Sequence, residues 1–85
     1  NRLTERGAAL AEAVALAARV ADGPANANAR IKTLCVQAGS NSLHEQLDLE
    51  AQLMVESQGD DEAQEGIAAF FGKRAPDFKA LRLKQ

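Results

Sequence analysis

Apolar residues recur at helical spacing in four separate stretches of this chain, and the first is rich in alanine. A helix is predicted from Glu5 to Ala21, with Thr4 as its cap and Asp22-Gly23-Pro24 as its stop. Its buried face is predicted from the spacing to hold Leu10, Val14, Ala17 and Ala21. A second stripe of small side chains would let another helix approach closely.

Two further helices follow at short intervals. The second is predicted over residues 24–38, with Gly39 as its stop. The third starts at Ser42, whose hydroxyl and the carboxylate of Glu45 form a capping box, and it continues to about Ser57. In a capping box the two side chains bind each other's backbone N–H groups, so this is a strong start signal.

The fourth predicted helix starts at Asp61, which forms a second capping box with Gln64. Pro76 forbids its continuation, and the remaining residues are predicted to form a tail. The tail carries Phe78, Leu81 and Leu83 between basic residues. No segment is predicted to be a strand, so the fold class is all-α, with about four helices in one domain over residues 1–85.

The apolar faces of these helices look too wide for a self-sufficient bundle of 85 residues. We expect part of this surface to meet the rest of a longer chain or another subunit. The net charge of −2 gives no basic field for nucleic acid, so no nucleic-acid partner is predicted. No apolar run approaches the roughly 20 residues of a membrane span, so no membrane partner is predicted either.

Candidate chemistry within the chain is sparse. One His and one Cys make an internal nucleophilic triad improbable, and no spacing typical of a metal site is present. No catalytic residue and no metal ligand are therefore assigned. His44 is interpreted as an exposed residue of the capping-box turn, and Cys35 as a small buried hydrophobe on the second helix.

Glu50 interrupts an apolar stripe on the third helix. The stripe contains Leu43, Leu47, Glu50 and Met54. A buried carboxylate needs a partner, and Arg30 or Lys32 on the preceding helix is predicted to supply it.

Lys73 and Arg74 follow the fourth helix and allow two interpretations. The first is compensation of the helix dipole by solvated cations. The second is an anion site, because Phe70 lies one turn before Lys73 and an aromatic face beside an ammonium suits a ligand with a ring and a phosphate.

A long motif around these residues resembles the C-terminal signature of the enoyl-CoA hydratase/isomerase (crotonase) family. The motif reads Glu65-Gly66-Ile67-Ala68-Ala69-Phe70-Phe71-Gly72-Lys73-Arg74-Ala75-Pro76-Asp77-Phe78. The Ala-rich first helix, Gly23-Pro24 and the Leu49-Glu50 pair fit the family as well. The resemblance thus covers nearly the whole chain.

The resemblance implies the C-terminal helical region that follows a spiral core of ββα units, with that core absent here. This region helps family members to form homo-oligomers, as trimers or dimers of trimers. The resemblance also implies that the catalytic acids and the oxyanion-hole N–H groups lie upstream of this chain. The implied location is cytoplasmic, or the mitochondrial matrix in a eukaryote.

By match to the motif, Phe70 and Lys73 are the expected contacts with coenzyme A. Coenzyme A is part of the acyl-CoA substrate, so no separate cofactor is expected. Arg74 is expected to be a structural or interface residue. Two alternatives stay open: a free-standing helical interaction module, and a family member that binds acyl-CoA without catalysis.

Overall fold

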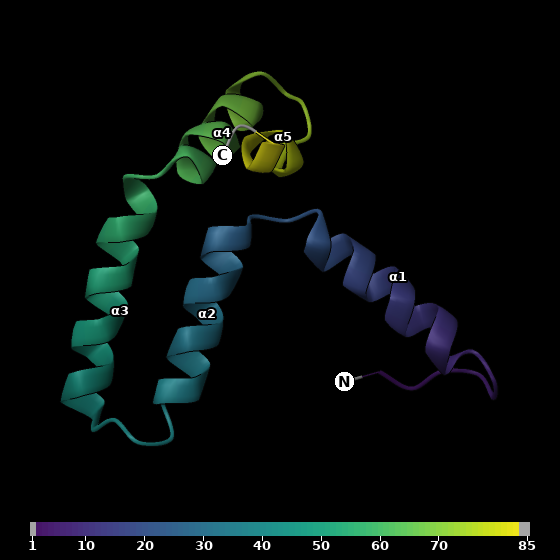
Figure 1. Ribbon diagram of the computed structural model, residues 1–85, viewed down its shortest axis with the longest axis horizontal. Helices are drawn as coiled ribbons and strands as arrows, with labels where there is room; N and C mark the ends of the chain where they lie inside the picture. Colours follow the sequence, from purple (N-terminus) through teal and green to yellow (C-terminus); the bar gives the residue numbers. More distant parts are fainter. Residues whose placement is uncertain (1, 84–85) are drawn as a thin grey trace.

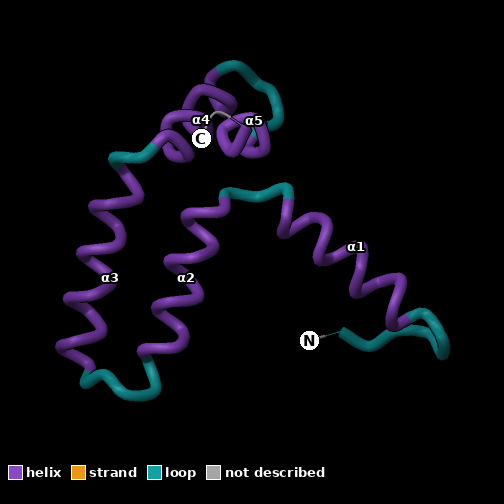
Figure 2. Tube along the Cα trace, viewed as in Figure 1, coloured by secondary structure: helices purple, strands orange, loops and turns teal. Residues whose placement is uncertain are grey.

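The structure is a computed structural model, and it describes residues 2–83. Figures 1 and 2 show helices joined by short loops, with no strand in the described part of the chain. The helices are α1 (Ala9–Ala21), α2 (Ala25–Gln37), α3 (Leu43–Gln58), α4 (Asp61–Phe71) and α5 (Phe78–Leu83). The all-α prediction is confirmed. None of the helices in residues 2–83 combines the length and apolarity that a membrane crossing requires.

The start of α1 differs from the prediction. The chain makes a turn in which Ala8 N–H donates to the Glu5 carbonyl at 3.0 Å, and Gly7 has a φ of +83°. This left-handed conformation favours glycine and interrupts a helix. The Thr4 hydroxyl donates to the Glu5 carbonyl instead of capping. The helix therefore begins at Ala9, and the predicted start at Glu5 with a Thr4 cap is wrong.

The capping box of α3 is confirmed. Glu45 N–H donates to Ser42 Oγ at 3.1 Å, and Ser42 N–H donates to Glu45 Oε1 at 2.8 Å. The hydrogen bonds from the Ser42 backbone and hydroxyl lower the pKa of the Glu45 carboxyl. The backbone N–H groups of Ser42 and Glu45 thus both have local acceptors, so α3 starts where the sequence predicts.

The cap of α4 is shifted by one residue. Ala63 N–H donates to Asp60 Oδ1 at 3.0 Å, and Asp60 has the extended backbone of a cap, whereas Asp61 is already helical. The predicted capping box of Asp61 with Gln64 is therefore wrong.

The predicted tail is also wrong, because residues 78–83 form α5. Ala80 N–H donates to Asp77 Oδ1 at 3.1 Å, so Asp77 acts as a local cap directly after Pro76.

The helices form an open arrangement rather than a bundle. Figure 1 shows α2 and α3 side by side as a hairpin, α4 and α5 above them, and α1 extending away. Two contacts tie α5 to the end of α1: an ion pair of 2.6 Å between Lys79 Nζ and Asp22 Oδ1, and a hydrogen bond from Arg82 to the Ala21 carbonyl. No contact of this kind holds the N-terminal half of α1 within residues 2–83.

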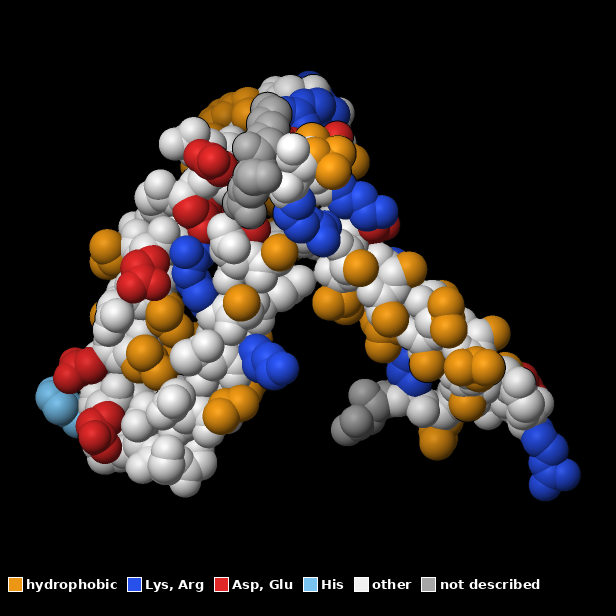
Figure 3. Space-filling model, in the orientation of Figure 1, with side chains coloured by type: hydrophobic (Ala, Val, Ile, Leu, Met, Phe, Trp, Pro, Cys, Tyr) orange, Lys and Arg blue, Asp and Glu red, His pale blue; other side chains and the backbone are white. Residues whose placement is uncertain are grey.

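The chain encloses almost no core. Its accessible surface is 6897 Å², whereas a compact monomer of this mass would expose about 4,900 Å². Its radius of gyration is 16.1 Å, against roughly 12 Å for a compact domain of this length. Ala69 is the one buried hydrophobic residue among those described, and Figure 3 shows apolar side chains gathered along α1. The predicted surplus of apolar surface is confirmed.

Candidate functional site

Lys73, one of the two predicted ligand contacts, lies in the turn that ends α4. Arg74 N–H donates to the Ala69 carbonyl at 3.0 Å, and Lys73 N–H donates to the Phe70 carbonyl at 3.3 Å. This pair of bonds is a Schellman motif, which satisfies the last carbonyls of a helix by turning one residue into the left-handed region. Lys73 is that residue, with a φ of +53°.

Lys73 adopts a left-handed backbone conformation that is unfavourable for a lysine. It is the one non-glycine residue among residues 2–83 with a positive φ. Left-handed backbone disfavours a residue with a Cβ by roughly 1–2 kcal/mol, which is why glycine usually occupies this position. The glycine of this turn is instead Gly72, where an added Cβ would lie 3.1 Å from the Ala68 carbonyl oxygen. Both positions are therefore constrained, and Lys73 carries the strain.

Three groups, which we call the loop brace, hold this turn in place: the side chains of Glu65 and Arg74 and the backbone N–H of Asp77. Arg74 Nη1 and Nη2 donate to the two Glu65 carboxylate oxygens at 2.6 and 3.1 Å. Asp77 N–H donates to Glu65 Oε2 at 2.7 Å. The hydrogen bond with Glu65 raises the pKa of Arg74. The prediction that Arg74 is structural agrees with this geometry.

Phe70 and Lys73 are three positions apart along the chain, and both side chains are exposed. Phe70 is 79% exposed, and its ring meets that of Phe71 edge-on, with centroids 5.7 Å apart. The Lys73 side chain has no ion pair or hydrogen bond within the described residues. The Phe70 ring thus lies in the last turn of α4, and the ammonium of Lys73 belongs to the turn that follows the helix.

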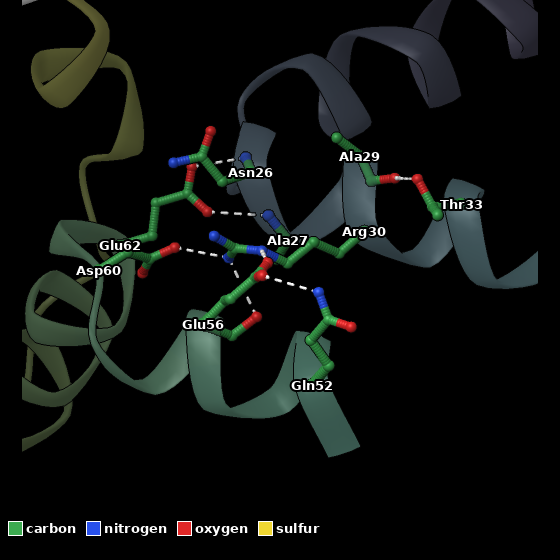
Figure 4. Close-up of polar contacts among 10 residues, drawn as sticks. Asn26, Ala27, Ala29, Arg30, Thr33, Gln52, Glu56, Asp60 and Glu62 are labelled. Carbon is green, nitrogen blue, oxygen red and sulfur yellow. Dashed lines mark hydrogen bonds and ion pairs between the residues drawn. The ribbon is translucent and has the colours of Figure 1, made fainter. Parts of the chain in front are cut away.

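A second polar cluster, the polar clasp, joins α2, α3 and α4 around Arg30 (Figure 4). Arg30 Nη1 donates to Asp60 Oδ2 at 2.6 Å and to Ser57 Oγ at 3.0 Å, and Arg30 Nε lies 3.9 Å from Glu56 Oε2. The hydrogen bond from Arg30 lowers the pKa of the Asp60 carboxyl. Asp60 therefore caps α4 with one oxygen and ties α4 to α2 with the other.

The predicted partnership of Glu50 is wrong. Arg30 is engaged by the polar clasp, and Glu50 is exposed, with no ion pair or hydrogen bond to the part of the chain that the structure describes. It lines an open apolar groove between α2 and α3. The other lining residues are Ala27, Arg30, Ile31, Leu34, Leu53, Met54 and Ser57. No segment of residues 2–83 covers this groove, so the Glu50 carboxylate is not buried by the apolar residues around it.

Of the other two sequence candidates, one is confirmed and one is wrong. Cys35 was expected to be buried, but it is exposed, because no segment of residues 2–83 covers that side of α2. His44 is exposed as predicted, 3.5 Å from Asp48 one turn later. Within the described residues, no group of three or more His, Cys, Asp or Glu side chains could hold a metal ion.

Sequence reasoning missed the residue that caps α2. Pro24 occupies the cap position and has no side-chain acceptor. The Glu62 carboxylate, from the first turn of α4, accepts from Asn26 N–H at 2.7 Å and Ala27 N–H at 3.0 Å (Figure 4). A cap-less Pro24 is the one sequence signal that could have prompted a search for a distant acceptor.

Comparison with known proteins adds two findings. The family model for enoyl-CoA hydratase/isomerase matches residues 3–81. A crystal structure of an enoyl-CoA hydratase from Polaromonas sp. JS666 is similar, with 40% sequence identity and a TM-score of 0.83. The similarity covers 88% of this chain and 29% of that one, so the chain spans less than a third of that structure. No curated protein matches the chain.

Proposed function

This chain belongs to the enoyl-CoA hydratase/isomerase family, and on that premise we propose that it completes the coenzyme A pocket of an acyl-CoA hydratase or isomerase. In this proposal the chain is the C-terminal helical segment of a longer protein. Enoyl-CoA hydratase is the favoured activity, because the similar structure is named as one. Lys73 and Phe70 are the proposed contacts.

The conformation of Lys73 is the observation that carries this proposal. A glycine at this position would avoid the strain, and within residues 2–83 the lysine side chain forms no ion pair or hydrogen bond that would offset it. Strained residues persist where the surroundings force them, and they cluster at binding sites. An ammonium held outside a turn is well suited to the phosphates of coenzyme A.

Phe70 supplies the apolar side of the proposed contact. Its exposed ring lies three positions before Lys73 in the chain, so a ligand that meets both side chains needs an apolar or aromatic part and an anionic part. Coenzyme A has that character, with an adenine ring, a pantetheine arm and phosphates.

The chemistry itself is proposed to lie outside this chain. Thioester enolates are stabilised by preorganised N–H donors, and hydration needs carboxyl groups as general acid and base. Glu56 and Glu65 are engaged in ion pairs with arginines, and Glu50 is exposed on an open groove. None of the three is assigned a catalytic role.

The surplus apolar surface supports a role in assembly. Side chains that a compact protein would bury are half or more exposed along α1, including Leu10, Val14 and Val20. We propose that the rest of the protein and neighbouring subunits cover this surface, in a trimer or a dimer of trimers.

The test is the dissociation constant of coenzyme A for the full-length protein, measured by calorimetry. Lys73→Ala is expected to raise it about tenfold, the loss expected for one charged hydrogen bond to phosphate. Lys32→Ala is the matched control, because Lys32 is exposed on α2 and also forms no ion pair within residues 2–83. Equal constants for wild type and Lys73→Ala would count against the proposal.

A further inference from the structure

The loop brace encloses Lys73 on both sides along the chain. Glu65 lies in the second turn of α4, before Lys73, whereas Arg74 and Asp77 follow it. The carboxylate of Glu65 accepts hydrogen bonds from the Arg74 guanidinium through both of its oxygens and from Asp77 N–H. Its side chain is 17% exposed, so these bonds are partly shielded from water.

The loop brace restricts the backbone conformation of Lys73. A strained backbone persists when its neighbours determine it from more than one direction. The Arg74 amide is fixed by the Ala69 carbonyl, and the Arg74 side chain is fixed by Glu65. With both ends of Arg74 held, the Lys73 backbone has little freedom to leave the left-handed region.

We propose that Glu65 and Arg74 are positioning residues for coenzyme A, because they hold Lys73 in the conformation that presents its ammonium to a phosphate. This inference rests on the proposed function of Lys73. Neither residue needs to touch the ligand. The planar, bidentate pairing of guanidinium and carboxylate suits this role, since it fixes orientation as well as distance.

The sign of the predicted effect separates positioning from simple electrostatics. Glu65→Gln removes a negative charge close to a site for an anion, which by Coulomb attraction alone would strengthen the binding of coenzyme A. It would also free Arg74 to attract the phosphate. Positioning predicts the opposite, because the amide weakens the bidentate pair and lets the turn relax.

The experiment is a double-mutant cycle in the full-length protein. Wild type, Lys73→Ala, Glu65→Gln and the double variant are compared by their dissociation constants for coenzyme A. Glu65→Gln is expected to raise the constant about threefold to tenfold in the wild-type background. In the Lys73→Ala background it is expected to change little, because a residue that acts through Lys73 has nothing left to position.

Matched variants separate positioning from general damage. Glu56→Gln removes the same charge from the polar clasp and is expected to leave the constant within twofold of wild type. Arg74→Lys keeps the charge but loses the two-pronged geometry, so it is expected to behave like Glu65→Gln. It also serves as the second test if Glu65→Gln does not fold, as judged by melting temperature and oligomer mass.

The outcomes distinguish the two proposals. An unchanged constant in Lys73→Ala would overturn the proposed function, and this inference with it. A raised constant in Lys73→Ala, together with unchanged or tighter binding in Glu65→Gln and Arg74→Lys, would overturn only the inference. Equal effects of Glu65→Gln with and without Lys73 would also overturn it, because they would show that Glu65 acts independently.

Discussion

At the scale of single residues, the binding role that we propose for Lys73 opposes its effect on stability. Its left-handed backbone costs free energy that glycine would not cost, yet its side chain finds no partner within residues 2–83. The sequence identified Phe70 and Lys73 as candidates through the family motif. It could not predict the conformation, because rules for helix ends expect glycine or asparagine there.

Replacing Lys73 by glycine is therefore predicted to stabilise the full-length protein by about 1 kcal/mol while weakening its affinity for coenzyme A. Thermal melting and calorimetry measure the two effects. Lys32→Gly is the control, since a glycine inside α2 is expected to destabilise by about 1 kcal/mol. A lower melting temperature for Lys73→Gly would show that the lysine is not strained.

Asp60 combines two roles that substitution can separate. Asp60→Asn keeps an acceptor for the α4 cap but removes the ion pair with Arg30, whereas Asp60→Ala removes both. We predict that Asp60→Ala destabilises more than Asp60→Asn by about 1 kcal/mol, the usual value of a cap. Denaturation in urea measures the difference. Equal losses would mean that the cap contributes nothing.

The ion pair of Asp60 also predicts a dependence on pH. Because the pKa of Asp60 is lower in the folded chain than its ordinary value of 3.8, its contribution is complete above that value and is lost as the pH falls through the folded pKa. The stability difference between wild type and Asp60→Asn is therefore expected to shrink as the pH falls below about 3.8. A difference that stays constant down to about pH 2 would contradict this assignment.

At the scale of elements, local signals predicted the helices, and long-range contacts adjusted their ends. Ser42 and Glu45 lie within one turn, so their capping box was visible in the sequence. The cap of α2 was not, because Glu62 lies 36 positions from Asn26. Asp77 is a local start signal for α5, but Pro76 directly before it favours the end of a helix, so the two signals conflict in the sequence. The pairing of Arg30 was not predictable either, because the packing of α4 brings Asp60 to Arg30 in place of Glu50.

Glu62 gives a prediction at this scale. Glu62→Ala is expected to leave the amides of Asn26 and Ala27 without acceptors and to speed their hydrogen exchange about tenfold, with the rest of α2 less affected. Exchange measured by NMR resolves these sites. Asp61→Ala, next to it on the same turn, is the control. Unchanged exchange at both amides would show that water or another group already satisfies them.

At the scale of the whole molecule, the open shape is the main physical fact. The fold class was predictable, and so were four of the five described helices, because apolar periodicity and helix caps are local sequence signals. The arrangement was not, since with Ala69 as the one buried hydrophobic residue in the described chain there is little core to determine it. Cys35 is exposed for the same reason, because no segment of residues 2–83 covers the apolar face of α2 on which it lies.

The shape leads to a prediction about activity. Purified residues 1–85 are expected to show no hydration of a short enoyl-CoA, because the proposed catalytic acids and oxyanion donors lie outside them. A spectrophotometric assay of the double bond of the thioester measures this, with the full-length protein as positive control. Turnover above background by residues 1–85 would contradict the proposed division of labour.

A crystal structure of the full-length protein with coenzyme A bound tests the proposed role of Lys73 and Phe70 most directly. We predict that Lys73 keeps its positive φ, that its Nζ lies within hydrogen-bond distance of a phosphate oxygen, and that the Phe70 ring contacts the ligand. A structure in which coenzyme A occupies a pocket away from this turn, with Lys73 in solvent, would contradict it.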